Sequence, residues 1–461
     1  MNIGVQEPPK AFAVRFRGLD LWNVGSHFAV KWGWSPKLIR SLGDVLFRRV
    51  EPLDSLGEKS VNLLTIRFDG SIEPRPSMPR KEIKGKLFHV YPNDVVFSKI
   101  DVRNGAIGIV PTGIDNACVT SEFPAYFVQE GLADPRYIKM LFRSKVFMRI
   151  LNSMISGASG RKRIQPTHLE NVKVPIPPLS VQKIIVDHWN NIEECIRLNE
   201  GEIQRIENEI TNQFVSCLGL RISDVSVHPK ILFVNWKAFE RWSVNYNQAR
   251  KTAINLALGK YPVVYLGSLL EKVQYGTSGK ANRDEAGFPI IRMNNIIDGK
   301  LNLSDLKYIS LSERDQRILL LNDGDILFNR TNSKELVGKC AVFHEEGDYV
   351  FASYLIRMRV NKEKANPDFI AYVINGPIGR RQIDALSRQI IGQANINSQE
   401  IRSLRVPLPP LEIQNSIMGF VSIKKSEIAD NHNALAILRQ KGKLEIEEMI
   451  LGLHPIADYS I

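Results

Sequence analysis

The loops of this chain carry clusters of basic, amide and hydroxyl side chains of the kinds that proteins use to bind nucleic acid. Arg and Lys can hydrogen-bond guanine O6 and N7, Asn and Gln can pair with adenine N6 and N7, and hydroxyl groups serve phosphates. Any single member could equally be a solvated loop residue, but the clusters together predict contact with DNA. The candidate DNA-binding residues are Lys99, Arg103, Arg161, Lys162, Arg163, Gln165, Thr277, Ser278, Lys280, Arg330, Asn332, Ser333, Lys334, Gln389, Gln393, Asn395 and Asn397.

No catalytic or nucleotide-binding motif accompanies these clusters. The nearest match to a phosphate-binding loop is 274–280 (QYGTSGK), where Gln274 stands in place of the first glycine and Ala281 in place of the Mg²⁺-binding hydroxyl residue. The GxGxxG, HExxH and GxSxG patterns and the Pro-Pro-aromatic motif of amino-methyltransferases are also missing. The eight histidines lack metal-ligand spacing. The sequence therefore predicts no catalytic residue, no metal ligand and no cofactor bound by this chain.

The sequence is internally duplicated. The segment 174–182 (VPIPPLSVQ) recurs at 406–414 (VPLPPLEIQ), 232 positions later, and half of the 461 residues is 230.5. Further matches at that offset, or one residue from it, are Ser121 with Ser353, Arg163 with Asn395, and 94–99 with 325–330. Solenoid repeats have periods of only ~20–50 residues, so this long period predicts one duplicated domain.

Each half predicts the same order of elements. Short apolar runs such as 94–97 and 325–328 predict strands separated by turn residues. One helix is expected at 136–153 and its counterpart at 368–386, each followed by a polar, glycine-containing loop. The prolines of each PPL segment should then hold the chain extended. The predicted fold class is α+β, with two tandem mixed α/β domains that are each followed by a long helix.

The residues after each PPL segment follow a heptad pattern. Their apolar spacing of 3.5 residues is typical of a coiled coil, whereas a simple amphipathic helix averages 3.6. The predicted helix-pairing residues are Ile185, Trp189, Ile192, Ile196, Asn199, Ile203, Ile206, Ile417, Val421, Ile428, Asn431, Leu435 and Leu438. Asn199 and Asn431 share one heptad position, where a buried amide can fix the register. At about 60 Å each, the helices are expected to form an antiparallel coiled coil, although packing on their own domains would also bury these residues.

The composition fits a globular protein with a polyanionic partner. The chain has a mass of 52.2 kDa, and its 61 Lys and Arg against 49 Asp and Glu give a net charge of +12 and a pI near 9.4. No apolar run reaches the ~18–20 residues of a membrane span, and the first 20 residues lack the apolar core of a signal peptide. Four scattered cysteines without a CxxC pair indicate a reducing compartment, so we expect a cytoplasmic protein without a membrane partner.

Taken together, these motifs resemble the DNA-specificity subunits of bacterial type I restriction–modification enzymes, over nearly the whole chain. The resemblance rests on the repeated VPxPPLxxQ segment that leads into a long helix, on 275–278 (YGTS) and on 325–339 (DILFNRTNSKELVGK). Trp22 and Trp242, which precede the two variable regions, fit the same pattern. The first half has no close counterpart of the YGTS turn, so its site residues depend more on the duplication.

The resemblance implies two target-recognition domains, each of which recognises one half of a split, asymmetric site in double-stranded DNA. The long helices would set the gap between the half-sites and dock two methyltransferase (modification) subunits, through which restriction/translocase subunits would join. Those partners would use S-adenosylmethionine, ATP and Mg²⁺. The implied division of the chain is an N-terminal segment at 1–30, target-recognition domain 1 at 31–174, a central long helix at 175–220, a connector at 221–254, target-recognition domain 2 at 255–406, a C-terminal long helix at 407–453 and a tail at 454–461.

Two other functions stay open at this point. A single-chain nuclease or DNA methyltransferase with an unrecognised site would cut or methylate DNA without partners. A coiled-coil scaffold that binds only protein would show no salt-sensitive DNA binding, and it would leave the polar loop clusters unexplained.

Overall fold

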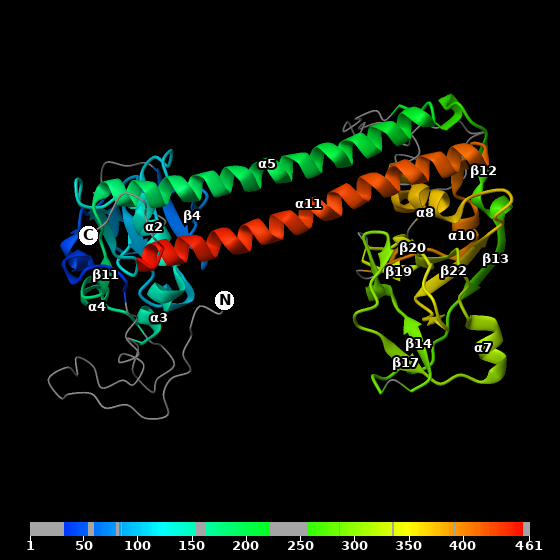
Figure 1. Cartoon of the computed structure of the whole chain (residues 1–461), viewed down its shortest axis with the longest axis horizontal. Coiled ribbons are helices and arrows are strands. Elements are labelled where there is room, and N and C mark those ends of the chain that lie inside the picture. The colour runs from blue at the N-terminus through cyan, green and yellow to red at the C-terminus, as the bar shows by residue number, and fades with distance from the viewer. Residues whose placement is uncertain are drawn as a thin grey trace. The chain divides into compact units, whose positions relative to one another are not determined.

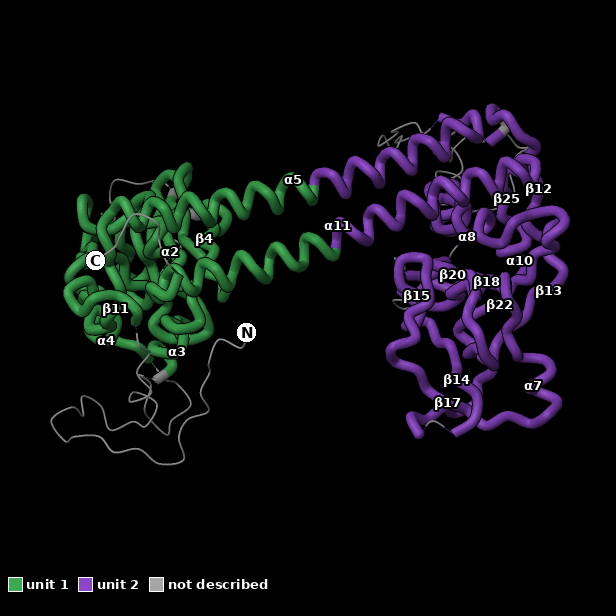
Figure 2. Tube along the Cα trace, viewed as in Figure 1, with its two compact units in different colours: residues 1–200, 433–461 green, residues 201–432 purple. Residues whose placement is uncertain are grey.

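The computed structural model describes residues 32–53, 60–79, 83, 85–153, 163–221, 256–284, 286–333, 336–386, 388–390 and 393–454. The chain divides into two compact units, which Figure 2 distinguishes by colour. Unit 1 comprises Met1–Glu200 with Asn433–Ile461, and unit 2 comprises Gly201–His432. Each unit therefore combines one mixed α/β domain with a segment of both long helices. None of the helices in the described ranges has the length and apolar character needed to cross a membrane.

The two units contain the same four-stranded antiparallel sheet (Figure 1). In unit 1 its strands, in spatial order, are β2 (Leu46–Arg49), β10 (Ala125–Val128), β7 (Val95–Phe97) and β8 (Ile107–Ile109). In unit 2 the corresponding strands are β13 (Leu270–Tyr275), β22 (Leu355–Val360), β18 (Asp325–Asn329) and β20 (Cys340–Val342). The duplication seen in the sequence is therefore a duplication of the fold, and the predicted fold class of two tandem mixed domains is confirmed.

Further strands flank each sheet, and both units contain one parallel pair, β3 with β9 in unit 1 and β14 with β21 in unit 2. The flanking strands of unit 1 are β3 (Ser60–Ile66), β4 (Ile72–Pro74), β5 (Met78–Pro79), β6 (Leu87–His89) and β9 (Ala117–Thr120). Those of unit 2 are β14 (Phe288–Ile291), β15 (Ile296–Ile297), β16 (Lys300–Leu301), β17 (Lys307–Ile309), β19 (Thr331–Asn332), β21 (Val350–Phe351), β23 (Arg388–Ile390) and β24 (Gln393–Asn395).

The prediction of one helix at 136–153 and one at 368–386 was wrong, because each range contains two helices. Unit 1 has α2 (Pro135–Arg143), α3 (Lys145–Ser153) and α4 (Pro166–Glu170), and unit 2 has α7 (Glu313–Leu319), α8 (Pro367–Asn375), α9 (Pro377–Leu386) and α10 (Ser398–Arg402). Ser144 leaves the helical conformation and its hydroxyl accepts a hydrogen bond from the backbone N–H of Phe147, which starts the next helix. Gly376 is extended because the residue before a proline avoids helical geometry.

Strand β18, one of the two central strands of the sheet in unit 2, is buried on both faces. Successive side chains of a strand point to opposite faces, so Ile326 and Phe328 join the core against α8 while Leu327 joins the core on the other side. The first of these cores also contains residues of the long helices, among them Ile206, Phe214, Ile417 and Val421. The helix segments are therefore part of the hydrophobic core of their unit.

A buried carboxylate lies directly before β7, the strand of unit 1 that corresponds to β18. Asp94, which is 2% exposed, accepts a hydrogen bond from the backbone N–H of Tyr91 at 2.9 Å. Arg49 on β2 donates to both its oxygens, at 2.6 and 3.0 Å. Burial raises the pKa of Asp94, although the Arg49 guanidinium acts against that rise. The bidentate pair fixes the start of β7 against β2.

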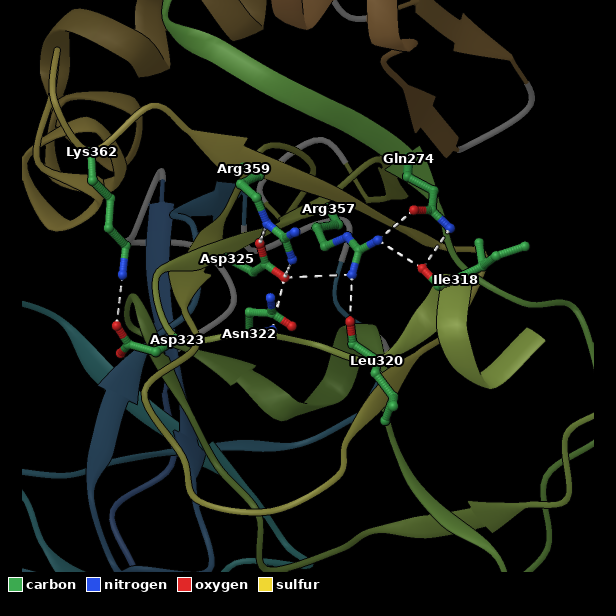
Figure 3. Close-up of polar contacts among 9 residues, drawn as sticks. All are labelled: Gln274, Ile318, Leu320, Asn322, Asp323, Asp325, Arg357, Arg359 and Lys362. Atoms are coloured by element: carbon green, nitrogen blue, oxygen red, sulfur yellow. Dashed lines mark hydrogen bonds and ion pairs between the residues drawn. The ribbon is translucent and has the colours of Figure 1, made fainter. Parts of the chain in front are cut away.

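The equivalent buried carboxylate of unit 2, Asp325, has more partners than Asp94 (Figure 3). Asp325, which is 1% exposed, accepts from the backbone N–H of Asn322 at 2.9 Å and from Arg359 at 2.8 Å on each oxygen. Arg357 is buried beside it and donates to Asp325 at 3.5 Å, to the carbonyl of Ile318 at 2.8 Å and to the side chain of Gln274. Burial lowers the pKa of Arg357, so the nearby carboxylate is needed to keep its charge favourable.

The VPxPPL segments begin as strands, so the extended chain expected there is paired with a second strand in each unit. β11 (Lys173–Pro175) pairs with β1 (Ile39–Ser41), and β25 (Arg405–Pro407) pairs with β12 (Val263–Tyr265). The first proline of each segment ends its strand, where no further backbone donor is required. The long helix begins four residues after that proline in both units.

A fully buried glutamine in the first turn of each long helix joins the helix to its domain. The Oε1 of Gln182 accepts from the backbone N–H of Asp134 at 2.8 Å, and its Nε2 donates to the carbonyls of Pro177 at 2.7 Å and Leu132 at 3.0 Å. Asp134 is the N-cap of α2, so one amide fixes the helix, the proline link and α2 together.

Gln414 makes the equivalent contacts in unit 2. Its Oε1 accepts from the backbone N–H of Asn366 at 2.8 Å, and its Nε2 donates to the carbonyl of Pro409 at 2.8 Å. Asn366 is the N-cap of α8. Both glutamines have no exposed surface, so the final residue of the VPxPPLxxQ repeat is structural.

The long helices are α5 (Leu179–Cys217) and α11 (Leu411–Leu451). In unit 1 they run antiparallel, since His188 lies 3.1 Å from Glu445 and Glu200, further along α5, pairs with Arg439. Seven of the predicted helix-pairing residues are buried, namely Ile185, Ile192, Ile203, Ile206, Ile417, Val421 and Leu435. The other six are half-buried, namely Trp189, Ile196, Asn199, Ile428, Asn431 and Leu438.

Two positions of the heptad pattern in α11 are not apolar side chains, namely Lys424 and Gly442, and the structure explains both. A Cβ on Gly442 would lie 2.7 Å from Ile192, so the missing side chain makes room for that isoleucine. Lys424 in unit 2 lies 3.5 Å from Glu209 and 3.0 Å from Glu427, so its charge is paired. Asn199 donates to the carbonyl of Cys195 in its own helix, so this amide contact does not fix the pairing register.

The buried glutamine yields a stability prediction. Gln182→Ala leaves the backbone N–H of Asp134 and two carbonyls without their partner, so unit 1 should lose about 3 kcal/mol of unfolding free energy. Amide hydrogen exchange across α2 should become correspondingly faster. Gln204→Ala, at an exposed position of the same helix, is the control and should change neither quantity appreciably. Equal exchange in the two variants would contradict the structural role of Gln182.

Candidate nucleic-acid interface

The predicted DNA-binding residues of unit 2 converge around Arg330, which directly follows β18. The backbone N–H of Arg330 donates to the carbonyl of Tyr354 at 3.0 Å, and its carbonyl accepts from the N–H of Ile396 at 2.9 Å. Its guanidinium lies 4.8 Å from the centre of the Tyr275 ring and contacts Asn395 Oδ1 at 3.5 Å. Arg330, directly after β18, thus contacts three other segments of the domain: Tyr275 of β13, Tyr354 before β22, and residues 395–396.

The turn after β13 reaches the same place. The backbone N–H of Thr277 donates to the carbonyl of Phe351 at 3.0 Å, and the N–H of Ser353 donates back to Thr277 at 2.8 Å. A Cβ on Gly276 would lie 2.3 Å from the Phe351 carbonyl, so only glycine fits this close approach. The exposed side chains of Ser278 and Lys280 follow directly on this turn.

A small three-stranded sheet in unit 2 brings the predicted amide residues together. Its order is β19–β24–β23, with Thr331 opposite Asn395 and Arg388 opposite Asn395 on the other side. The backbones of Gln389 and Gln393 lie in this sheet, whereas their side chains and Lys334 lie outside the described residues. The backbones of Asn332, Gln389, Gln393 and Asn395 thus belong to one small sheet whose strand β19 directly follows Arg330.

Three predicted residues make local structural contacts. Asn397 is the N-cap of α10, since its Oδ1 accepts from the N–H groups of Gln399 and Glu400 at 2.9 Å each. Asn332 accepts from the N–H of Ser333 at 2.8 Å. The sequence-based choice of these residues did not anticipate that their amides or backbone hold the loops in shape.

Unit 1 repeats the backbone arrangement with different side chains. The N–H of Lys99 donates to the carbonyl of Glu122 at 3.1 Å, and the carbonyl of Lys99 accepts from the N–H of Ile164 at 2.9 Å. The Lys99 ammonium donates to the carbonyl of Ser121 at 2.6 Å, and Arg163 Nη2 lies 3.3 Å from Glu122 Oε2.

The other predicted residues of unit 1 are exposed or lie outside the described residues. Gln165 is the N-cap of α4 and makes no capping bond with its side chain, which is exposed. Arg103 is exposed in the turn after β7. Arg161 and Lys162 lie outside the described residues.

Three residues of the interface were absent from the predicted set. They are Tyr275, which lies under the Arg330 guanidinium, Tyr354, whose side chain is 52% exposed, and Glu122. The match of Ser121 with Ser353 contains the missed signal, because it places Glu122 and Tyr354 at equivalent positions of the two domains. A search limited to basic, amide and hydroxyl types excluded them.

The arrangement suits recognition of DNA and offers no metal centre in the described ranges. No cluster of three or more His, Cys, Asp and Glu with metal-binding geometry occurs among the described residues. A cleft of about 1010 Å³ in unit 2 is lined by parts of α8 and α11 and by none of the predicted DNA-binding residues. Arg330 and Lys99 are themselves half-buried, whereas Tyr275 and Tyr354 beside Arg330 and Arg163 near Lys99 are exposed, so part of each cluster is accessible to a duplex.

The comparisons with known proteins agree on one family. The chain matches the family model described as "Type I restriction modification DNA specificity domain" over residues 87–208 and 260–435. It is 24% identical over 333 residues to the EcoKI type I restriction enzyme specificity subunit of Escherichia coli K12, which covers 71% of this chain and 67% of that protein. It is also 29% identical over 196 residues to the putative MjaX specificity subunit of Methanocaldococcus jannaschii, which covers 42% of this chain and 46% of that protein.

The fold has a solved relative as well. A chain in a structure titled for complex assembly and conformational transition of the type I R-M system has a TM-score of 0.59 and 14% identity, and the match covers 90% of this chain and 98% of that chain. At this identity the likeness concerns the fold alone, and it agrees with the two tandem mixed domains.

The exposed Lys280 after the turn that follows β13 yields a binding prediction. Lys280→Ala should reduce the slope of log K against log[salt] for DNA binding by the assembled complex by up to about 0.9, because one phosphate contact fewer releases fewer counterions. Lys173→Ala, at an exposed position of β11, is the charge-matched control and should leave the slope unchanged. Identical slopes for both variants would remove Lys280 from the interface.

Proposed function

The chain belongs to the type I restriction–modification DNA specificity family, and from this membership we propose that its two domains recognise the two halves of a split, asymmetric DNA sequence. As a specificity subunit it is a DNA-recognition component and not an enzyme. The observation that carries the proposal is the repeated backbone arrangement around Lys99 and Arg330. Two equal frames with equal side chains would favour a symmetric site, whereas these frames carry different side chains at Lys99 and Arg330, Glu122 and Tyr354, and Arg163 and Asn395.

We propose further that α5 and α11 serve as the spacer and as the docking surface for two methyltransferase subunits. Large apolar side chains on these helices face solvent, including Leu198 at 58% exposed, Ile423 at 63% and Ile437 at 65%. Exposed apolar groups of this size on an otherwise polar helix favour a protein partner. Restriction/translocase subunits would join through the methyltransferases, and S-adenosylmethionine, ATP and Mg²⁺ would be bound by those partners.

A domain exchange tests the split-site proposal. Replacing residues 255–406 by the corresponding domain of a relative should change one half of the methylated motif and preserve the other half and the gap. The measurement is methylome sequencing of a host that carries the chimera and its methyltransferase. Exchanging residues 31–174 in the same way should change the opposite half. A chimera that alters both halves, or neither, would defeat the proposal.

The same purified chain can be tested against the enzymatic alternative. Without partner subunits it should neither cut nor methylate DNA in the presence of S-adenosylmethionine and Mg²⁺. Methyl transfer or cleavage by the chain alone would favour a single-chain nuclease or methyltransferase.

A charged substitution tests the docking surface. Ile437→Asp should abolish co-purification of the methyltransferase subunits and DNA methylation, because a charge would replace an apolar contact. Its own stability should change little, since the position is exposed. Gln440→Asp, also exposed on α11, introduces the same charge and should leave the complex intact. Normal assembly of the Ile437 variant would exclude this face as the docking surface.

A further inference from the structure

The repeated backbone frame defines equivalent side-chain positions in the two domains. Lys99 and Arg330 each donate their N–H to one segment and accept at their carbonyl from another. These bonds make Glu122 equivalent to Tyr354 and Ile164 equivalent to Ile396. Glu122 and Tyr354 are the first position of an equivalent pair. The second position is the residue before each isoleucine, which is Arg163 in unit 1 and Asn395 in unit 2.

The two pairs carry complementary but different chemistry. In unit 1 the pair is Glu122 with Arg163, whose side chains are 43% and 46% exposed and lie 3.3 Å apart. In unit 2 it is Tyr354, whose side chain is largely exposed, and Asn395, whose Oδ1 contacts Arg330. In both units the pair flanks the cationic residue at the centre of the candidate interface.

Each pair matches the major-groove edge of one kind of base pair. A guanidinium can donate to guanine O6 and N7 while a carboxylate accepts from cytosine N4, so Glu122 and Arg163 suit G·C. A carboxamide can bond adenine N6 and N7 while an aromatic ring contacts the thymine methyl, so Tyr354 and Asn395 suit A·T. The chemical difference between the two domains is therefore a difference in the base pair each can accept.

We propose that positions 122 and 163 of unit 1 and positions 354 and 395 of unit 2 are equivalent specificity-determining pairs, the first selecting a G·C and the second an A·T base pair. The inference rests on the proposed function, because it assigns bases within the two half-sites.

The structure also makes the pairs suitable for substitution. A half-exposed ion pair contributes little to stability, so replacing Glu122 and Arg163 should leave unit 1 folded. The backbone bonds that hold the frame do not involve these side chains. Specificity and folding can therefore be measured separately.

Grafting one pair onto the other domain is the decisive experiment. The double variant Glu122→Tyr, Arg163→Asn in the assembled complex should convert one G·C pair in one half of the methylated motif to A·T, with a preference of about tenfold or more. The reciprocal variant Tyr354→Glu, Asn395→Arg should convert one A·T pair to G·C in the other half. Methylome sequencing reports both. An unchanged motif in either half would overturn the assignment for that pair.

A matched control and a conservative variant keep the result decisive. Arg67, directly after β3, and Glu73 on β4 form an exposed ion pair 2.7 Å apart, and Glu73→Tyr, Arg67→Asn should leave the motif unchanged. A changed motif in this control would attribute the effect to charge alone and overturn the proposal. If the graft at positions 122 and 163 abolishes methylation, the single variant Glu122→Gln tests the assignment instead. This variant should relax selection at a single base pair of the methylated motif. An unchanged motif in this variant would refute the role of Glu122.

The outcomes also separate this inference from the proposed function. A wild-type complex that methylates a split motif while the grafts leave its bases unchanged would refute only the pair assignment. A wild-type motif without two separate halves would refute the proposed function itself.

Discussion

The candidate interface depends on a carboxylate buried at the start of the central strand in each domain. Burying a charge is costly, and here Arg49 or Arg359 offsets the cost with two short hydrogen bonds to Asp94 or Asp325. The strand that follows is five residues long in unit 2, and it delivers Arg330 to the surface directly after its last residue. The position of the cationic group is therefore set by an ion pair several residues away, in the domain interior.

A second buried polar group connects this domain to the long helices. Gln182 and Gln414 satisfy backbone groups of the proline link and of the cap of α2 or α8, so the first turn of each long helix is part of the domain. Helix residues then continue the same cores, as Ile185 does in unit 1 and Ile417 in unit 2. A partner that binds the helices would thus contact elements rigidly joined to the recognition domain.

Much of this could be predicted from the sequence, because the duplication makes weak patterns count twice. The repeat follows from matching segments at one offset, the coiled-coil pattern from apolar periodicity, and the fold class from the order of elements in each half. The division of the predicted helix at Ser144 comes from a local cap on Phe147, and the close fit of Gly442 against Ile192 depends on tertiary packing; apolar periodicity contains neither. Asn397 shows the limit for the site, since its residue type suits adenine while its amide caps α10. Residue type indicates what a side chain can bind, but only local geometry shows what it already binds.

The separation of frame residues from the proposed contact residues would allow one scaffold to serve the two proposed half-sites. The stabilising groups, such as Asp325 and Gln414, are almost fully buried, and their partners are buried or half-buried arginines or backbone groups. Glu122 and Tyr354, in contrast, are partly exposed and contribute only their backbone carbonyls to the frame. Substitutions at the exposed positions therefore cost little folding free energy, whereas a change in the frame would move every contact residue at once. A duplicated domain built in this way can diverge in base preference while each copy keeps the same fold.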